Sequence, residues 1–168
     1  MTSINHLLEL CTLFIKEDSL ANEVRLAHHQ PLNYLNQFKE ELQERGVEKP
    51  LQTLPWLALV DGLQRRGFLQ ELDWKDDAEE VINTVLQLTK SHKNHTEIST
   101  ALMAIESYAD EDIEAFIPTL NRELEQHNLQ LVWLDIDSDS YPLTILFFND
   151  LPIAKELAVK AGYGIIKK

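Results

Sequence analysis

Two short apolar segments, "LQLVWLDID" (Leu129–Asp137) and "YPLTILFFN" (Tyr141–Asn149), decide the fold of this 168-residue chain. Both are rich in Leu, Val, Ile and aromatic residues, and the polar residues between them favour a turn. This pattern predicts a β-hairpin. A helix, "DLPIAKELAVKAG", is expected next, with Asp150 as its cap, Pro152 in its first turn and Gly162 past its end, followed by a short terminal strand in "YGIIKK".

The first strand of this hairpin is expected at the centre of the sheet. A helical crossover returns the chain in the direction of the second strand, so the terminal strand runs antiparallel to the first and can pair with it. Both faces of the segment Leu131–Ile136 are apolar, as a covered central strand requires, with Leu131 and Trp133 on one face and Val132, Leu134 and Ile136 on the other. We therefore predict a three-stranded antiparallel sheet.

The rest of the chain is expected to be mainly helical, because apolar residues recur there at three- and four-residue intervals. The expected helices are Ile4–Ile15, Asp18 or Ser19 to before "HHQP", Pro31–Arg45, Pro55 to before Gly67, "AEEVINTVLQL", Thr96–Tyr108, and "DEDIEAFIPTLNRELEQHN" with a kink or break near Pro118. Asp73, three residues before Asp76 and just ahead of "AEEVINTVLQL", indicates an aspartate-capped helix start. The stretch "FLQELDW" fits a short strand or a loop equally well.

These elements together predict one α+β domain over residues 1–168. Its helical part occupies about residues 1–128, and its hairpin, crossover helix and terminal strand occupy about residues 129–168. A length of 168 residues with 44% hydrophobic content suits a single core-forming unit.

The composition favours a neutral or basic partner. Fifteen Lys and Arg against 28 Asp and Glu give a net charge of −13, which opposes binding to nucleic-acid phosphates or to anionic membranes. The single cysteine, Cys11, allows no intramolecular disulfide and fits a reducing compartment. Since the N-terminal stretch lacks the pattern of a secretory signal and no apolar run reaches membrane-spanning length, we expect a cytoplasmic protein.

Three aspartates at alternate positions, Asp135, Asp137 and Asp139, form the main candidate for chemistry. In an extended strand the first two would share a face, about 6.6 Å apart, where they could hold a divalent cation. Two established metal patterns do not fit: a calcium loop would require Gly and Glu where Ser140 and Leu146 stand, and no Gly-Ser turn precedes the strand as in nucleotidyltransferases. The competing interpretation is a hairpin turn, because Asp and Ser side chains bond to nearby backbone groups.

The remaining candidate residues give less support for a functional site. His92, His95 and Glu97 offer metal-ligand types at short spacing, but "SHKNH" is also a typical polar connector between helices. No nucleophile elbow and no glycine-rich phosphate loop occurs in the sequence. Trp56 and Trp74 are expected in the core, whereas an exposed pair would mark an interaction patch.

Two stretches, "LDWKDDAEEV" and "WLDIDSDSYPL", resemble an uncharacterised bacterial family classified only as a domain of unknown function. The resemblance implies a bacterial cytoplasmic protein and supplies no activity. The positions that it singles out are Asp73, Trp74, Trp133, Asp135, Asp137, Ser138, Asp139 and Tyr141.

Two functional hypotheses follow. The leading one is a non-catalytic, acidic protein-interaction module, such as a regulator or an immunity-type partner, because the sequence holds no complete catalytic constellation. The alternative is a divalent-metal-dependent hydrolase or transferase in which Asp135 and Asp137 hold the ion and Asp139 completes the shell. A third, imitation of nucleic-acid charge, is opposed by the scatter of the acidic residues among helix starts.

Overall fold

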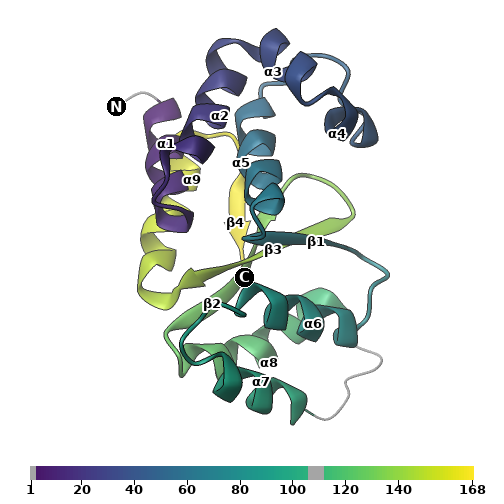
Figure 1. Ribbon diagram of the computed structural model, residues 1–168, viewed down its shortest axis with the longest axis vertical. Helices are drawn as coiled ribbons and strands as arrows, with labels where there is room; N and C mark the ends of the chain where they lie inside the picture. Colours follow the sequence, from purple (N-terminus) through teal and green to yellow (C-terminus); the bar gives the residue numbers. More distant parts are fainter. Residues whose placement is uncertain (1–2, 106–111) are drawn as a thin grey trace.

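The computed structural model describes residues 3–105 and 112–168, and Figure 1 shows the elements that they form. The α-helices are α1 (Ser3–Phe14), α2 (Asp18–His29), α3 (Pro31–Gln37), α4 (Lys39–Glu44), α5 (Leu54–Arg65), α6 (Ala78–Leu88), α7 (His95–Met103), α8 (Ile113–Glu125) and α9 (Leu151–Ala161). The strands are β1 (Leu69–Asp73), β2 (Leu129–Asp135), β3 (Ser140–Phe147) and β4 (Ile165–Lys167). A 3-10 turn, η1 (Phe148–Asp150), leads into α9.

The strands form a four-stranded sheet in the order β1-β3-β2-β4, and every neighbouring pair is antiparallel. The predicted hairpin is β2 and β3, and the predicted pairing of the terminal strand with the first hairpin strand is confirmed by β2 and β4. The sheet has one strand more than predicted, because the "FLQELDW" stretch contributes β1. The α+β prediction is confirmed.

Helices cover both faces of the sheet, as Figure 1 shows: α1, α2, α5 and α9 lie on one side, and α6, α7 and α8 lie on the other. Each side has its own cluster of buried apolar residues. Val132 and Leu134 of β2 belong to the first cluster, and Leu131 and Trp133 belong to the second, as the alternation predicted. Burial of each large apolar side chain stabilises the fold by about 1.5–3 kcal/mol. Because β2 contributes such side chains to both clusters, it stabilises both cores.

A buried side chain extends the sheet where β4 ends. β4 pairs with β2 only as far as Lys167 opposite Trp133, which leaves the backbone of Leu131 without a strand on that side. Asn121 of α8 fills this place: its Nδ2 donates to the Leu131 carbonyl at 3.0 Å, and its Oδ1 accepts from the Leu131 N–H at 2.7 Å. The Asn121 amide therefore supplies hydrogen-bond partners to two buried backbone groups of β2.

Several helix predictions need correction. The predicted helix Pro31–Arg45 is divided at Phe38, whose φ of −113° and ψ of 33° end α3 before α4 begins. Phe38 packs on Tyr34 with ring centroids 4.6 Å apart, and the Arg65 guanidinium lies 4.2 Å from its ring. The interruption is thus accompanied by a local ring contact with Tyr34 and a tertiary contact with Arg65 of α5, although the sequence has neither glycine nor proline there.

Two further helices, α6 and α8, differ from the prediction. α8 continues through Pro118 without a break. Proline removes one helical hydrogen bond, but the residues on either side of it stay buried and hold the helix in place. The cap of α6 is Asp77, whose side chain accepts from the Glu80 N–H at 3.0 Å, and Asp73 instead ends β1. The predicted helix Thr96–Tyr108 corresponds to α7, and Tyr108 itself lies outside the described residues.

None of the helices within residues 3–105 and 112–168 is long and apolar enough to cross a membrane.

Candidate functional site

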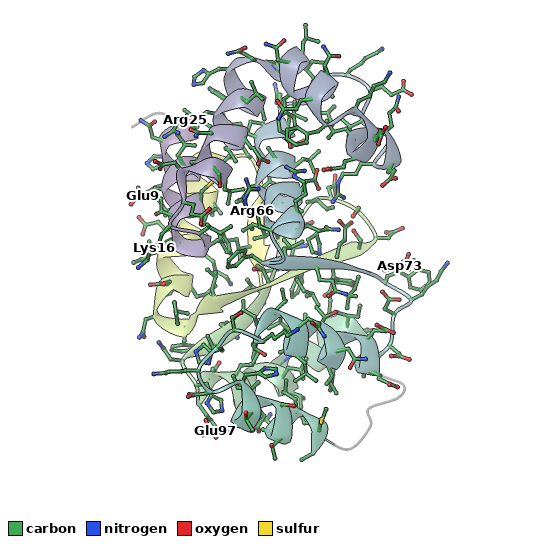
Figure 2. All side chains as sticks on the ribbon, viewed as in Figure 1. Glu9, Lys16, Arg25, Arg66, Asp73 and Glu97 are labelled. Atoms are coloured by element: carbon green, nitrogen blue, oxygen red, sulfur yellow. The ribbon has the colours of Figure 1, made fainter. Side chains whose placement is uncertain are left out.

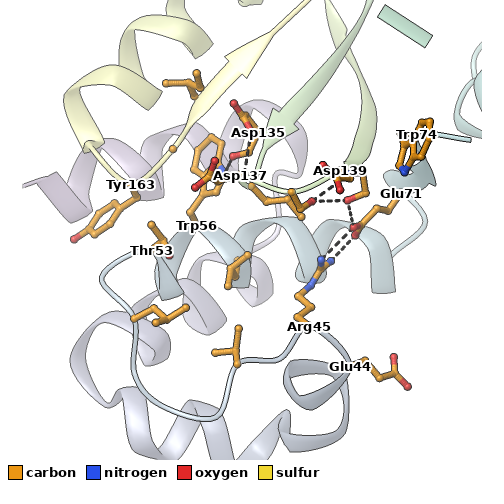
Figure 3. Close-up of a pocket in the computed structure, with 18 of the residues that line it drawn as sticks. Glu44, Arg45, Thr53, Trp56, Glu71, Trp74, Asp135, Asp137, Asp139 and Tyr163 are labelled. Carbon is orange, nitrogen blue, oxygen red and sulfur yellow. Dashed lines mark hydrogen bonds and ion pairs between the residues drawn. The ribbon is translucent and has the colours of Figure 1, made fainter. Parts of the chain in front are cut away.

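All four strands reach the same end of the sheet, and a cleft lies there. In the strand register Asp73 is opposite Ser140 and Asp135 is opposite Ile165, so each strand contributes a terminal residue to this end. The connection between α4 and α5, together with the first turn of α5, faces these strand ends across the cleft (Figure 3). The cleft has a volume of about 840 Å³, which lies within the range of roughly 300–1,000 Å³ common for ligand sites.

Six of the residues singled out from the sequence line this cleft. They are Asp73, Trp74, Asp135, Asp137, Ser138 and Asp139. The two motif stretches, which are about 60 residues apart in the sequence, therefore meet because β1 pairs with β3. A hydrogen bond of 3.1 Å from the Trp74 N–H to the Asp139 carbonyl ties the two stretches directly.

The other two predicted positions, Trp133 and Tyr141, lie elsewhere. Their rings pack edge to face with centroids 5.8 Å apart, on the side of the sheet that α8 covers. The Tyr141 hydroxyl donates to Glu114 of α8 at 3.1 Å. These contacts hold α8 against the sheet, and neither residue lines the cleft.

The hairpin turn uses the side chains of the acidic stretch for its own backbone. Oδ1 of Asp135 accepts from the Asp137 N–H at 3.0 Å, and Asp137 adopts a left-handed conformation with φ of 58°. The Ser138 and Ser140 hydroxyl groups lie 2.8 Å apart, and Ser138 Oγ also accepts from the Ser140 N–H at 3.3 Å. This is the local bonding expected of Asp and Ser in turns.

Asp135 also forms an ion pair across the edge of the sheet. Its Oδ2 lies 2.5 Å from Nζ of Lys167, the residue that ends β4. Burial raises the pKa of Asp135, but the hydrogen bonds from Lys167 and from the Asp137 amide outweigh it, so the pKa lies below its ordinary value of 3.8. Both carboxylate oxygens of Asp135 are thus engaged by groups of the protein itself.

The described residues contain no group of three or more His, Cys, Asp or Glu side chains placed to hold a metal ion. In the "SHKNH" connector, His92 Nδ1 accepts from the Asn94 N–H at 3.2 Å, and His95 Nδ1 lies 3.4 Å from the Thr89 hydroxyl. These local contacts are typical of a connector between two helices.

Trp56 forms the buried floor of the cleft. The side chain is 1% exposed, as predicted for a core residue, and its Nε1 donates to the Asp135 carbonyl at 2.8 Å. Gly164 lies directly against the indole, because a Cβ added there would be 2.2 Å from Trp56 Cε2. A residue without a side chain is therefore required where the chain enters β4.

Trp74, by contrast, lies on the rim with 56% of its surface exposed, so its predicted place in the core is wrong. It directly follows Asp73, the last paired residue of β1, and lies in the turn that leads to α6, so it is beyond the paired part of the sheet. Lys75 Nζ lies 5.3 Å from the centroid of its ring. Leu51 and Ile165, 46% exposed each, add further apolar surface to the cleft.

Partly buried ion pairs of Arg45 with Glu71 and Asp61 lie at one end of the cleft, and the sequence did not predict them. Arg45, at the end of α4, donates to Glu71 of β1 through Nη2 at 2.5 Å and through Nη1 at 3.2 Å (Figure 3). Burial raises the pKa of Glu71, but hydrogen bonds from Arg45 and from the Ser140 hydroxyl outweigh it and lower the pKa overall. The only sequence signal for Glu71 is its inclusion in the ambiguous "FLQELDW" stretch.

The cleft carries an excess of negative charge. Besides Asp135 and Glu71, whose charges are paired, the described residues that line it include Glu44, Asp73, Asp137 and Asp139. None of these four carboxylates forms an ion pair with another described residue. In Figure 2, Asp73 is on the opposite side of the molecule from Lys16 and Arg25, so those cations do not neutralise it.

The fold and the site together define an α+β protein with an acidic, aromatic-rimmed cleft at the end of its sheet. The family model described as "Domain of unknown function (DUF6630)" matches residues 6–168, and the chain belongs to this family. Neither a search of curated proteins nor a search of solved structures finds a match.

Proposed function

We propose that this protein is a non-catalytic interaction module, a regulator or an immunity-type partner, whose acidic cleft binds a positively charged segment of another protein. The observation that carries the proposal is a set of four carboxylates around one cleft that have no ionic partner among the described residues: Glu44, Asp73, Asp137 and Asp139. Complementary charge accelerates association and selects the partner more than it adds raw affinity. A partner segment with Lys or Arg is the occupant that this charge favours.

The apolar surface of the cleft supports a protein segment as the ligand. Trp74, Leu51 and Ile165 are each about half exposed beside the carboxylates. Exposed tryptophan is enriched where proteins bind one another, and its ring face also attracts a cation. A segment that alternates basic and apolar side chains would satisfy both features, whereas the charge of the cleft opposes a nucleic acid or an anionic membrane.

The proposal includes a bacterial, cytoplasmic setting. Cys11 is buried as a free thiol, and burial raises its pKa to about 12, so the thiolate form is suppressed. A buried, unreactive thiol is compatible with a reducing compartment.

A basic peptide tests the proposal directly. The probe is a short labelled peptide of alternating lysine and leucine, with a glutamate-leucine peptide as the charge control, and binding is followed by fluorescence anisotropy. Removing the four charges should weaken binding on the order of tenfold or more, since each exposed pair contributes about 0.5 kcal/mol. The test variant combines Glu44→Gln, Asp73→Asn, Asp137→Asn and Asp139→Asn.

A matched control variant removes the same number of carboxylates away from the cleft. It combines Glu9→Gln, Glu17→Gln, Glu97→Gln and Glu125→Gln, all of them exposed positions outside the cleft lining. The control should bind the lysine peptide like the wild type, and the wild type should lose affinity as salt is added. Equal weakening in both variants would refute the proposal, because net charge alone would then explain the binding.

A further inference from the structure

A second, smaller cavity adjoins the acidic cleft. Its volume is about 340 Å³, and Glu44, Arg45 and Glu71 line both spaces, so the Arg45–Glu71 ion pair lies between them. Asp61, from the middle of α5, lines only the smaller cavity.

Asp61 has an unused hydrogen-bonding atom. The residue is only 5% exposed, and its Oδ1 accepts from Arg45 through Nε at 2.9 Å and lies 2.7 Å from Nη2. Its Oδ2 is buried and has no hydrogen-bond partner among the described residues. A buried carboxylate oxygen without a donor is costly. Because Asp61 lines the smaller cavity, a donor that enters this cavity is one way to satisfy the oxygen, and a buried water is the other.

The two arginines of the cavity bond to oxygen atoms other than Asp61 Oδ2, and Arg45 reaches Asp61 only through Oδ1. Both terminal nitrogens of Arg45 bond to Glu71. Arg65 bonds to Glu41 and to Glu23, each through one terminal nitrogen. Neither guanidinium is therefore directed to Asp61 Oδ2.

We propose that this cavity is a subsite for one lysine side chain of the partner segment, with Asp61 Oδ2 accepting from the ammonium group. The inference rests on the proposed function, because the lysine belongs to the segment held in the adjoining cleft. An ammonium group is a compact donor that can use one isolated acceptor, whereas a guanidinium fork prefers two parallel oxygens. The corresponding pair of oxygens, on Glu71, is already occupied by Arg45.

The charges of the cavity agree with a cationic occupant. Its described lining includes four carboxylates against two arginines: Glu41, Glu44, Asp61 and Glu71 against Arg45 and Arg65. Burial raises the pKa of Asp61, and the Arg45 charge counteracts this only in part. An added ammonium group would stabilise the ionised carboxylate further.

Entry of the lysine requires a side chain of the cavity wall to move, because Oδ2 is shielded from solvent. Gln64 is an exposed residue of α5 that lines this cavity, and it lies outside the Arg45 network. It therefore offers a position where the subsite can be altered without disturbing Asp61 or the ion pairs.

The experiment compares the lysine-leucine peptide with an arginine-leucine peptide of equal length on the intact protein. The wild type should bind the lysine peptide several-fold more tightly than the arginine peptide. Gln64→Lys, which places a competing ammonium group at the cavity, should remove that preference, while Gln64→Met should retain it. Asp61→Asn, which keeps one oxygen for Arg45 and replaces the acceptor Oδ2 by a donor, should also remove it, provided that its melting curve remains cooperative.

The outcomes separate this inference from the proposed function. If both peptides bind equally and the Gln64 and Asp61 variants change nothing, while the four-carboxylate variant still weakens binding, the subsite is refuted and the cleft remains. Such a result would assign Asp61 Oδ2 to a buried water. If neither peptide binds the wild type, the proposed function and the subsite both fail.

Discussion

Replacing Asn121 by alanine should lower the free energy of unfolding substantially, although the residue is far from the cleft. The substitution leaves the Leu131 N–H and carbonyl buried without partners, as the Asn121 amide supplies a bond of 2.7 Å to one and 3.0 Å to the other. Each such group costs about 1–3 kcal/mol, and the better helix propensity of alanine returns about 0.6 kcal/mol, which gives a loss of roughly 1.4–5.4 kcal/mol for the two groups. Chemical denaturation followed by circular dichroism measures it, with an unchanged slope showing that the denatured state is the same.

Two further variants make the result specific. Asn83→Ala, at an exposed position of α6, changes only helix propensity and should leave stability equal or slightly higher. Asn121→Asp keeps the acceptor for the Leu131 N–H but loses the donor and buries a charge. The pKa of the introduced carboxyl group is therefore raised in the folded state, so its deficit should shrink as pH falls and the group regains a proton. A loss below about 1 kcal/mol for Asn121→Ala would refute the role assigned to the amide.

Three more predictions concern the cleft. Gly164→Ala should lower the melting temperature and shift tryptophan fluorescence, because the new Cβ would lie 2.2 Å from the Trp56 ring; an unchanged melting curve would contradict this close approach. Asp135→Asn should be destabilising at neutral pH, and the difference from the wild type should vanish as pH falls well below 3.8, because the pKa of Asp135 is lowered in the folded state and protonation removes the stabilisation that the ionised form provides. A difference in melting temperature that is independent of pH would argue against the Lys167 ion pair. Mg²⁺, Mn²⁺ and Ca²⁺ should leave the melting temperature of metal-stripped protein unchanged, whereas a saturable rise that is lost in an Asp135→Asn, Asp137→Asn double variant would favour the metal-dependent hydrolase or transferase.

The hairpin could be predicted because β2 and β3 are continuous apolar runs separated by turn residues, and the two faces of β2 follow from the fixed alternation of side-chain direction along a strand. β1 could not be told from a loop for a related reason. Leu69 packs into one core and Leu72 into the other, so apolar residues three positions apart lie on opposite faces and no alternation results. The interruption of the third helix at Phe38 was not predicted either, since it coincides with a long-range contact to Arg65 of α5.

The acidic side of the cleft was predicted in part. Asp135, Asp137 and Asp139 stand together in the sequence, and their turn chemistry is visible in their residue types. Arg45, Asp61 and Glu71 come from three different elements, and no short motif joins them. Their meeting depends on how α4 and α5 pack beside β1, which local patterns do not encode.

The first core of this protein brings together helices and a strand that lie far apart in the sequence, and this affects how the core forms during synthesis. α1 and α2 are translated well before α9 and β4, but the apolar cluster that buries them contains residues of all four elements. Contacts between such distant segments form only after most of the chain is present. The apolar faces of α1 and α2 therefore remain partly uncovered until α9 and β4 have been made, and cellular chaperones have their best opportunity to bind them during this interval.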